Sequence, residues 1–235
     1  MHKPAEVTPM TRPWLSAQRT LALLIVAMTI SPSRAEMISV DEHPIGTPPP
    51  GFTIALTGSG GPAKWVVRKA PTDLPGNVIA QTSAEAVDNR FPLLIYDQVS
   101  AQNLDLSVKF QPVSGKLDQA AGLVWRYQDA KNYYLVRANA LEDNVVLYKV
   151  QNGVRSDLAL RGTTGKTYGA KAPVLKNAWN TLTVEVNGPL FSITFNGIDL
   201  FEVEDTTFTA AGKSGLWTKA DSDMLFEDFS VTPAP

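Results

Sequence analysis

Four side chains between residues 118 and 150 have the chemistry needed to hold a ligand. They are Arg126, Tyr133, Arg137 and Asn139. An arginine can form two parallel hydrogen bonds to a carboxylate or to vicinal hydroxyls, and an asparagine adds both a donor and an acceptor. A row of such side chains among aromatic residues favours binding of a polyhydroxylated ligand, and nothing in the row resembles a catalytic device.

Strand periodicity predicts that these four residues share one face of a sheet. Side chains two residues apart point to the same side of a strand, so Tyr133, Arg137 and Asn139 should lie together. The same rule places Arg126 on the face of Gly122 in the preceding strand, where a glycine leaves room for a ring. The alternative is that both arginines pair with acidic neighbours and only stiffen the sheet. The candidate acids are Asp129, Glu142 and Asp143.

Trp217 and Lys219 form a second candidate pair for ligand binding. Two residues apart on an expected strand, they share a face, and Asp221 follows with a further polar group. An indole can stack on the apolar C–H face of a sugar, and an ammonium can bind its hydroxyls. The alternative is that Trp217 belongs to the core, which is the usual place of an aromatic residue in a sandwich.

No catalytic residue is predicted from this chain. Glycoside hydrolysis needs two carboxylates about 5–10 Å apart, and the acidic runs 202–205 and 221–223 lack the spacing that would align such a pair on one strand. The two histidines, His2 and His43, lie outside the expected domain, which excludes a histidine-based triad or zinc site within it. Asp228 is the one position where we expect a structural Ca²⁺, and no other cofactor is expected.

Composition narrows the class of partner. The formal charge is −2 and no basic cluster occurs, so nucleic acid is not an expected partner. The chain has no cysteine, which excludes disulfides, thiolate metal sites and cysteine nucleophiles. Its stability must therefore come from burial in a large core.

The first 35 residues have the features of a signal peptide. Arg12 and Arg19 precede the apolar run 21–30, and the small residues Ser33 and Ala35 fit a signal-peptidase site. A retained membrane anchor is the alternative, but a run of about 10 apolar residues is short of the roughly 20 that span a bilayer. We expect a periplasmic or secreted protein without stable membrane insertion after cleavage. Its parts would be a signal peptide at 1–35, a proline-rich leader at 36–51 and one domain at 52–235.

The domain is expected to be all-β. Alternating segments are separated by turn residues, and residues 104–110 alternate strictly between apolar and polar side chains. Asn-Gly pairs at 152–153, 187–188 and 196–197 are signals for type I′ hairpin turns. Residues 161–171, with three glycines, are the longest expected loop. A dozen or so strands without a long helix predict a two-sheet antiparallel β-sandwich.

With the strands placed, the chain resembles the concanavalin A-like lectin/glucanase superfamily over nearly the whole domain. Within that superfamily it looks similar to bacterial exported proteins of the 3-keto-disaccharide hydrolase-like group. The segments that carry the resemblance are VSGK (113–116), DQAAGLVWRY (118–127), NYYLVRAN (132–139), AWNTL (178–182), GLWTKADS (215–222) and FEDF (226–229).

The resemblance implies a jelly-roll sandwich with one concave sheet and carbohydrate as the default ligand. Three functions remain open because one fold hosts many. The first is a non-catalytic glycan-binding protein, which we expect. The second is a hydrolase or lyase acting on oxidised (3-keto) glycosides, and the third is a structural or partner-binding module of the envelope. The Glu-x-Asp-x-x-Glu motif of the superfamily's glucanases is absent from this sequence.

Overall fold

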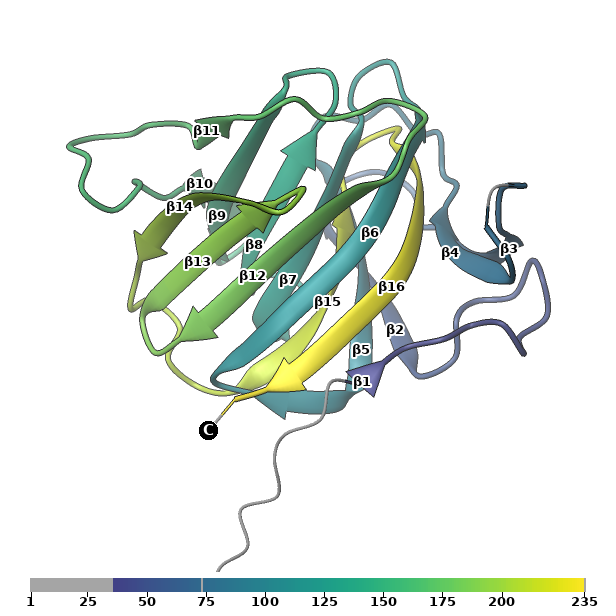
Figure 1. Ribbon diagram of the computed structural model, residues 1–235, viewed down its shortest axis with the longest axis horizontal. Coiled ribbons are helices and arrows are strands. Elements are labelled where there is room, and N and C mark those ends of the chain that lie inside the picture. The colour runs from purple at the N-terminus through teal and green to yellow at the C-terminus, as the bar shows by residue number, and fades with distance from the viewer. Residues whose placement is uncertain (1–35, 73, 235) are drawn as a thin grey trace, which may run out of the picture. The chain divides into compact units, whose positions relative to one another are not determined.

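The computed structural model describes residues 36–72 and 74–234, which belong to one compact unit. The predicted signal peptide, 1–35, lies outside the described residues. Sixteen strands and no helix make up the part that is described. No helix long and apolar enough to span a membrane occurs there. The strands form two antiparallel sheets stacked face to face (Figure 1), so the predicted fold class, a two-sheet antiparallel jelly-roll sandwich, is confirmed.

Sheet A forms the front layer in Figure 1. Its strands follow the order β14-β13-β12-β6-β16-β4-β3, and the short β1 also pairs with β16. Their bounds are β14 Ile198–Glu204, β13 Leu190–Phe195, β12 Asn180–Asn187, β6 Leu104–Ser114, β16 Asp223–Pro233, β4 Asn77–Gln81, β3 Trp65–Lys69 and β1 Glu36–Met37.

Sheet B lies behind it, in the order β10-β9-β8-β7-β15-β5-β2, and β11 also pairs with β9. The bounds are β10 Val154–Asp157, β9 Asn144–Gln151, β8 Asn132–Asn139, β7 Ala120–Asp129, β15 Gly212–Thr218, β5 Arg90–Ala101, β2 Phe52–Gly58 and β11 Ala170–Lys171. The alternating segment 104–110 forms most of β6, as predicted.

The main core fills the space between the two sheets. Strict alternation in β6 turns Leu104, Leu106, Val108 and Phe110 inward, as the sequence predicted. Sheet B contributes side chains from its facing side, among them Leu123, Trp125, Tyr134 and Val136. Burial of these side chains stabilises the sandwich by roughly 1.5–3 kcal/mol for each large apolar residue.

Sheet B is also strongly curved toward its outward side, the side that faces away from sheet A, and its edge strands close over that side. Five inter-strand steps separate β10 from β5, which is roughly 24 Å across a flat sheet. Nevertheless, the Cζ atom of Arg155 on β10 lies 4.7 Å from the ring centroid of Phe91 on β5. Likewise, the hydroxyl of Thr57 on β2 lies 2.9 Å from that of Tyr133 on β8. We call this curled side of sheet B the concave face.

The concave face holds a second apolar core of its own. It is made of Phe91, Leu93, Ile95, Ala120, Val124, Tyr133, Leu135, Val146, Tyr148, Val150 and Trp217, all of them buried. Both sides of sheet B are therefore apolar, which explains why β7 and β8 read as nearly continuous apolar runs.

Two of the three predicted hairpin turns follow the Asn-Gly signal. Asn152 and Gly153, and likewise Asn196 and Gly197, both have positive φ, as a type I′ turn requires. The third turn differs, because Asn187 pairs with Leu190 and the two loop residues are Gly188 and Pro189. Gly188 has φ +55°, which fits the first central position of a type II′ turn.

Residues 36–51, which we expected to form a leader, pack against the sandwich. Glu36 and Met37 pair with the last strand, and Val40 is buried in the main core. Residues 46 and 47 exchange backbone hydrogen bonds with Val67. The sandwich therefore includes residues that precede Phe52, where the sequence analysis placed its start.

Candidate functional site

Arg137 organises a polar cluster where β8 and β9 meet. Its side chain is 2% exposed, and Nη2 lies 2.9 Å from Glu142 Oε2, 3.0 Å from Tyr168 Oη and 3.2 Å from Tyr148 Oη. Nη1 donates to Asn144 Oδ1. The alternative in which this arginine pairs with Glu142 is thus confirmed. Because Arg137 is enclosed, its guanidinium contacts other protein groups and holds them in place.

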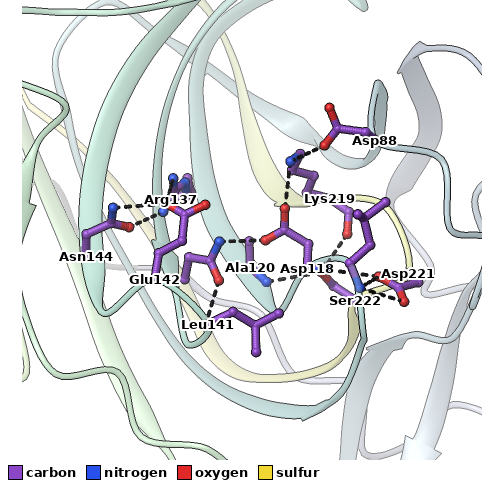
Figure 2. A network of polar contacts seen from close by, with 12 residues as sticks. Asp88, Asp118, Ala120, Arg137, Leu141, Glu142, Asn144, Lys219, Asp221 and Ser222 are labelled. Carbon is purple, nitrogen blue, oxygen red and sulfur yellow. Dashed lines mark hydrogen bonds and ion pairs between the residues drawn. The ribbon is translucent and has the colours of Figure 1, made fainter.

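A second chain of charges continues from Asn139. Its Nδ2 donates to Asp118 Oδ1 at 2.6 Å, and Lys219 Nζ lies 2.7 Å from Asp118 Oδ2. Lys219 also pairs with Asp88 at 2.6 Å. In Figure 2, Asp118 lies just before β7, Glu142 lies in the turn between β8 and β9, and Lys219 lies in the loop after β15. We call the set Asp88, Asp118, Arg137, Asn139, Glu142, Asn144, Tyr148, Tyr168 and Lys219 the charged network.

The pKa values of two network carboxylates, the buried Asp118 and the partly exposed Glu142, are shifted in opposite directions. Burial raises the pKa of Asp118, against the opposing effect of Lys219. Burial also acts on Glu142, but the charge and hydrogen bond of Arg137 outweigh it and hold the Glu142 pKa below its usual value. Burial likewise disfavours the Lys219 ammonium, yet its bonds to Asp118 and Asp88 raise its pKa. Lys219 therefore remains charged at neutral pH.

Two hollows open beside this network. One, of about 580 Å³, is lined by residues of the 141–144 turn and by 167–171. The other, of about 320 Å³, is lined by Asp88, Asn89, Phe91, Gly153, Val154 and Arg155. Glu142 and Tyr168 line the first hollow, and Asp88 lines the second. Network groups therefore reach both hollows.

Of the predicted ligand-binding residues, five lie on or at the end of the concave face. Arg137, Asn139 and Lys219 belong to the charged network. Tyr133 and Trp217 are 0% exposed and form part of the concave core. The Trp217 ring stacks on Phe91 at 5.6 Å between centroids. The core interpretation of Trp217 is therefore the one that the structure supports.

Arg126 does not share a face with Gly122 and Val124, so that prediction was wrong. A bulge in β7 interrupts the pairing with β8, and Arg126 there has φ +46°. The side chain turns to the other side of the sheet, where its guanidinium lies 5.5 Å from the Phe191 ring of the main core. It donates to the carbonyl oxygens of Gln102, Gly188 and Phe208. Arg126 thus joins three loops and does not pair with an acid.

Asp228, the predicted calcium position, lies on β16 at an irregularity in its pairing with β6. Its Oδ2 atom is 2.6 Å from Lys109 Nζ. The bond to Asp228 raises the pKa of Lys109, and burial of the ammonium opposes this effect only in part. Within residues 36–72 and 74–234, no group of three or more His, Cys, Asp or Glu side chains converges as a metal site would require.

The acidic runs that lacked catalytic spacing have structural partners. Asp221 accepts the backbone N–H groups of residues 116, 117 and 118, which positions Asp118 for the network. Asp205 accepts hydrogen bonds from Tyr134 and Lys149.

Sequence reasoning missed Asp88, Asp118, Tyr168 and Arg155 as site residues. Glu142 was considered only as a partner of an arginine. Asp88, Tyr168 and Arg155 lie in loops or on a short polar edge strand, where no periodicity marks them. Asp118 stands just before β7 and is the first residue of the segment 118–127 that carried the family resemblance, which was the one available signal.

Comparison with solved structures finds the same architecture in a carbohydrate-binding module, CBM66, from Bacillus subtilis. The TM-score is 0.58 with 23% identity over 77% of this chain and 95% of that one. The chain has this sandwich fold. A protein of unknown function with a galectin-like fold from Bacillus subtilis follows, with a TM-score of 0.48, 10% identity and coverage of 77% and 88%.

Domain 4 of an extracellular GH43 arabinanase from Geobacillus stearothermophilus, in complex with arabinotriose, has a TM-score of 0.45, 14% identity and coverage of 77% and 82%. No protein-family model and no curated protein matches the sequence.

Proposed function

We propose that this protein binds carbohydrate at the charged network, without chemical conversion of its ligand. The observation that carries the proposal is the combination of a rigid charged interior with exposed polar ends. Arg137 and Lys219 are fixed by buried partners, while the side chains of Glu142 and Asp88 are 36% and 75% exposed. Tyr168 is 48% exposed and adds a ring and a hydroxyl.

This arrangement suits sugars because their hydroxyls both donate and accept. Charge-assisted hydrogen bonds are roughly twice as strong as neutral ones, so a carboxylate held by an arginine is a good acceptor for a sugar hydroxyl. Arg137 holds Glu142 in one orientation, which reduces the entropy lost when a ligand binds. The Tyr168 ring supplies the apolar surface on which a pyranose C–H face packs.

The fold of the chain supports the proposal only generally, since sandwiches of this kind serve many functions. Export of the protein to the periplasm or the medium, directed by residues 1–35, is part of the same proposal. It can be tested by sequencing the N-terminus of the processed protein.

A glycan array tests the proposal directly. The purified protein, with and without calcium, is compared with Glu142→Gln and Tyr168→Phe, because truncation of the enclosed Arg137 would also disturb the fold. We expect binding to one class of glycan, a loss of at least tenfold in each variant, and melting temperatures within about 2 °C of the wild type.

Glu185→Gln on sheet A is the matched control for this array. Glu185 is an exposed carboxylate on the opposite sheet, so its substitution should leave glycan binding unchanged. Equal losses in the control and in Glu142→Gln would contradict the assignment of the site. An array without any bound glycan would refute carbohydrate binding.

A second candidate is hydrolysis of oxidised (3-keto) glycosides, as in the group that the sequence resembles. The opposite pKa shifts of Asp118 and Glu142 favour it, because an acid–base pair needs one protonated and one ionised carboxyl. Against it, Asn139 and Lys219 each bond to one Asp118 oxygen, and the Lys219 ammonium favours the ionised carboxylate, whereas a proton donor must be protonated. If the wild type hydrolyses a 3-keto-disaccharide and Asp118→Asn does not, hydrolysis would replace carbohydrate binding as the preferred function.

A further inference from the structure

Arg155 lies at the opening of the concave core, in contact with its aromatic residues. It projects from β10, the edge strand of sheet B. Its Cζ atom lies 4.5 Å from the ring centroid of Tyr148, 4.7 Å from that of Phe91 and 5.8 Å from that of Trp217. Cation–π attraction to three rings fixes the position of the guanidinium.

The guanidinium of Arg155 lacks the polar partners that the other arginines have. Within the described residues, Arg68, Arg90, Arg137 and Arg161 each pair with a carboxylate, and Arg126 bonds to backbone carbonyls. Arg155 has neither kind of contact there, and its Nη1 is buried without an acceptor. A buried donor without a partner destabilises the folded protein.

The nearest carboxylate on the same side is already engaged. Asp88 lines the same hollow as Arg155, and the charge of Arg155 contributes to lowering the Asp88 pKa, after the larger effect of its bond to Lys219. Lys219 lies 2.6 Å from Asp88, between that residue and Asp118. Asp88 is thus bonded to Lys219, and none of the network carboxylates forms an ion pair with the Arg155 guanidinium.

The space in front of Arg155 is large enough for a sugar ring. The hollow that it shares with Asn89 and Phe91 has a volume of about 320 Å³, at the lower end of the roughly 300–1,000 Å³ typical of small-molecule sites. Phe91 contributes an apolar wall, and Asn89 adds an amide at the same opening.

We propose that Arg155 is a binding site for the carboxylate of an acidic sugar, so that the ligand of this protein is a glycan that contains uronic acid. This inference rests on the proposed carbohydrate binding and names its ligand class. The aromatic rings cover the guanidinium, while the N–H groups at its edge are suited to bind a carboxylate through two parallel hydrogen bonds. Binding supplies an acceptor for N–H groups that have none in the described residues.

Isothermal titration with matched acidic and neutral oligosaccharides tests this inference. The probes are oligogalacturonate, oligomannuronate and hyaluronan fragments, each together with its carboxyl-reduced neutral counterpart. We expect the wild type to bind at least one acidic probe about tenfold or more tightly than its neutral counterpart. The ratio should fall to near one in Arg155→Gln. Arg155→Lys keeps the charge but loses the paired geometry, so it should retain only part of the preference.

Arg161→Gln is the control, since Arg161 is an exposed arginine that pairs with Glu202 of sheet A. It should keep the full acidic-to-neutral ratio. Equal affinity of the wild type for both members of every pair would overturn the inference while carbohydrate binding stands. A preference that survives in Arg155→Gln would also overturn it, because the carboxylate would then bind elsewhere. Failure to bind any glycan, acidic or neutral, would overturn both proposals.

If the Arg155→Gln variant does not fold, the Arg155→Lys variant tests the inference. A folded lysine variant with the full acidic preference would show that the guanidinium fork is not required and would overturn the site as described. A reduced preference at an unchanged melting temperature would support it, since a purely structural role of Arg155 would not alter the acidic-to-neutral affinity ratio.

Discussion

The outward sides of the two sheets differ in a way that strand alternation alone does not explain. On sheet A this side is open over β6, β12 and β13, with a hollow of about 700 Å³ lined by residues such as Asp105, Thr183 and Glu185. Only over β3, β4 and β16 does it carry a small apolar cluster, which includes Val78, Ala80 and Leu225. On sheet B it is the concave face, which is apolar and closed by the curl that brings β10 and β2 toward the middle of the sheet.

This difference explains why the polar groups of the candidate site lie at the end of the concave face. Its middle is filled by side chains such as Trp217 and Tyr133, which leave no groove for a ligand. The polar groups gather where the apolar core ends, and there Arg137, Lys219 and Arg155 are held in fixed positions. In this sandwich the curled sheet acts as the rigid support, and its border carries the candidate site.

The largest expected effect comes from truncating the concave core. Trp217→Ala should lower the free energy of unfolding by about 4 kcal/mol because it leaves a large cavity, and the melting temperature by roughly 10 °C. Ile198→Ala, which truncates an exposed apolar residue of sheet A, should change stability by less than about 0.5 kcal/mol. Thermal unfolding of both variants checks this. Similar values for the two would mean that the concave face is not a second core.

Removal of Arg126 should have the next largest effect. Arg126→Ala leaves three loop carbonyls without their charged donor and should cost about 3 kcal/mol. Because its guanidinium lies on the main-core side of sheet B, glycan binding by the folded protein should persist. Chemical denaturation followed by glycan titration measures both quantities. Lost binding at full stability would return Arg126 to the ligand-binding set.

A smaller, pH-dependent effect is expected at Glu142. Its pKa in the folded protein is below the usual 4.5, so its contribution to stability is fully present above that value. The contribution is lost as the pH falls through the lowered pKa. Glu142→Gln should therefore be less stable than the wild type at pH 7, by up to about 1 kcal/mol, and the two should converge as the pH falls below the lowered pKa of Glu142. Melting curves from pH 3 to pH 7 test this. A difference in melting temperature between the wild type and Glu142→Gln that increases toward low pH would contradict it.

The smallest effect is expected on the open side of sheet A. Asp105 and Glu185 are direct cross-strand partners, and like charges that face each other destabilise a sheet. Glu185→Lys should raise the melting temperature by about 1 °C, and the gain should vanish at high salt. A decrease at low salt would show that this pair does not repel.

Much of the fold could be predicted because alternation is a local property. The pattern of β6 and the Asn-Gly turns at 152 and 196 follow directly from the residues. The curl of sheet B could not be predicted, because contacts such as Arg155 with Phe91 join residues far apart in the chain. The orientation of Arg126 was missed because its positive φ is rare for arginine and nothing in the sequence marks the bulge. At the site, Arg137 and Asn139 were found by spacing, whereas Asp88 and Tyr168 come from loops.

The position of β16 has a consequence for when this chain can fold. The last strand of the sequence lies inside sheet A, between β6 and β4, and also holds β1 (Figure 1). Until its residues have been synthesised, sheet A consists of separated pieces, each with unpaired edges. Completion of sheet A must therefore wait for the residues of β16, and pairings between such distant segments form slowly. A chain that has not yet paired these strands remains extended enough to pass through a narrow channel.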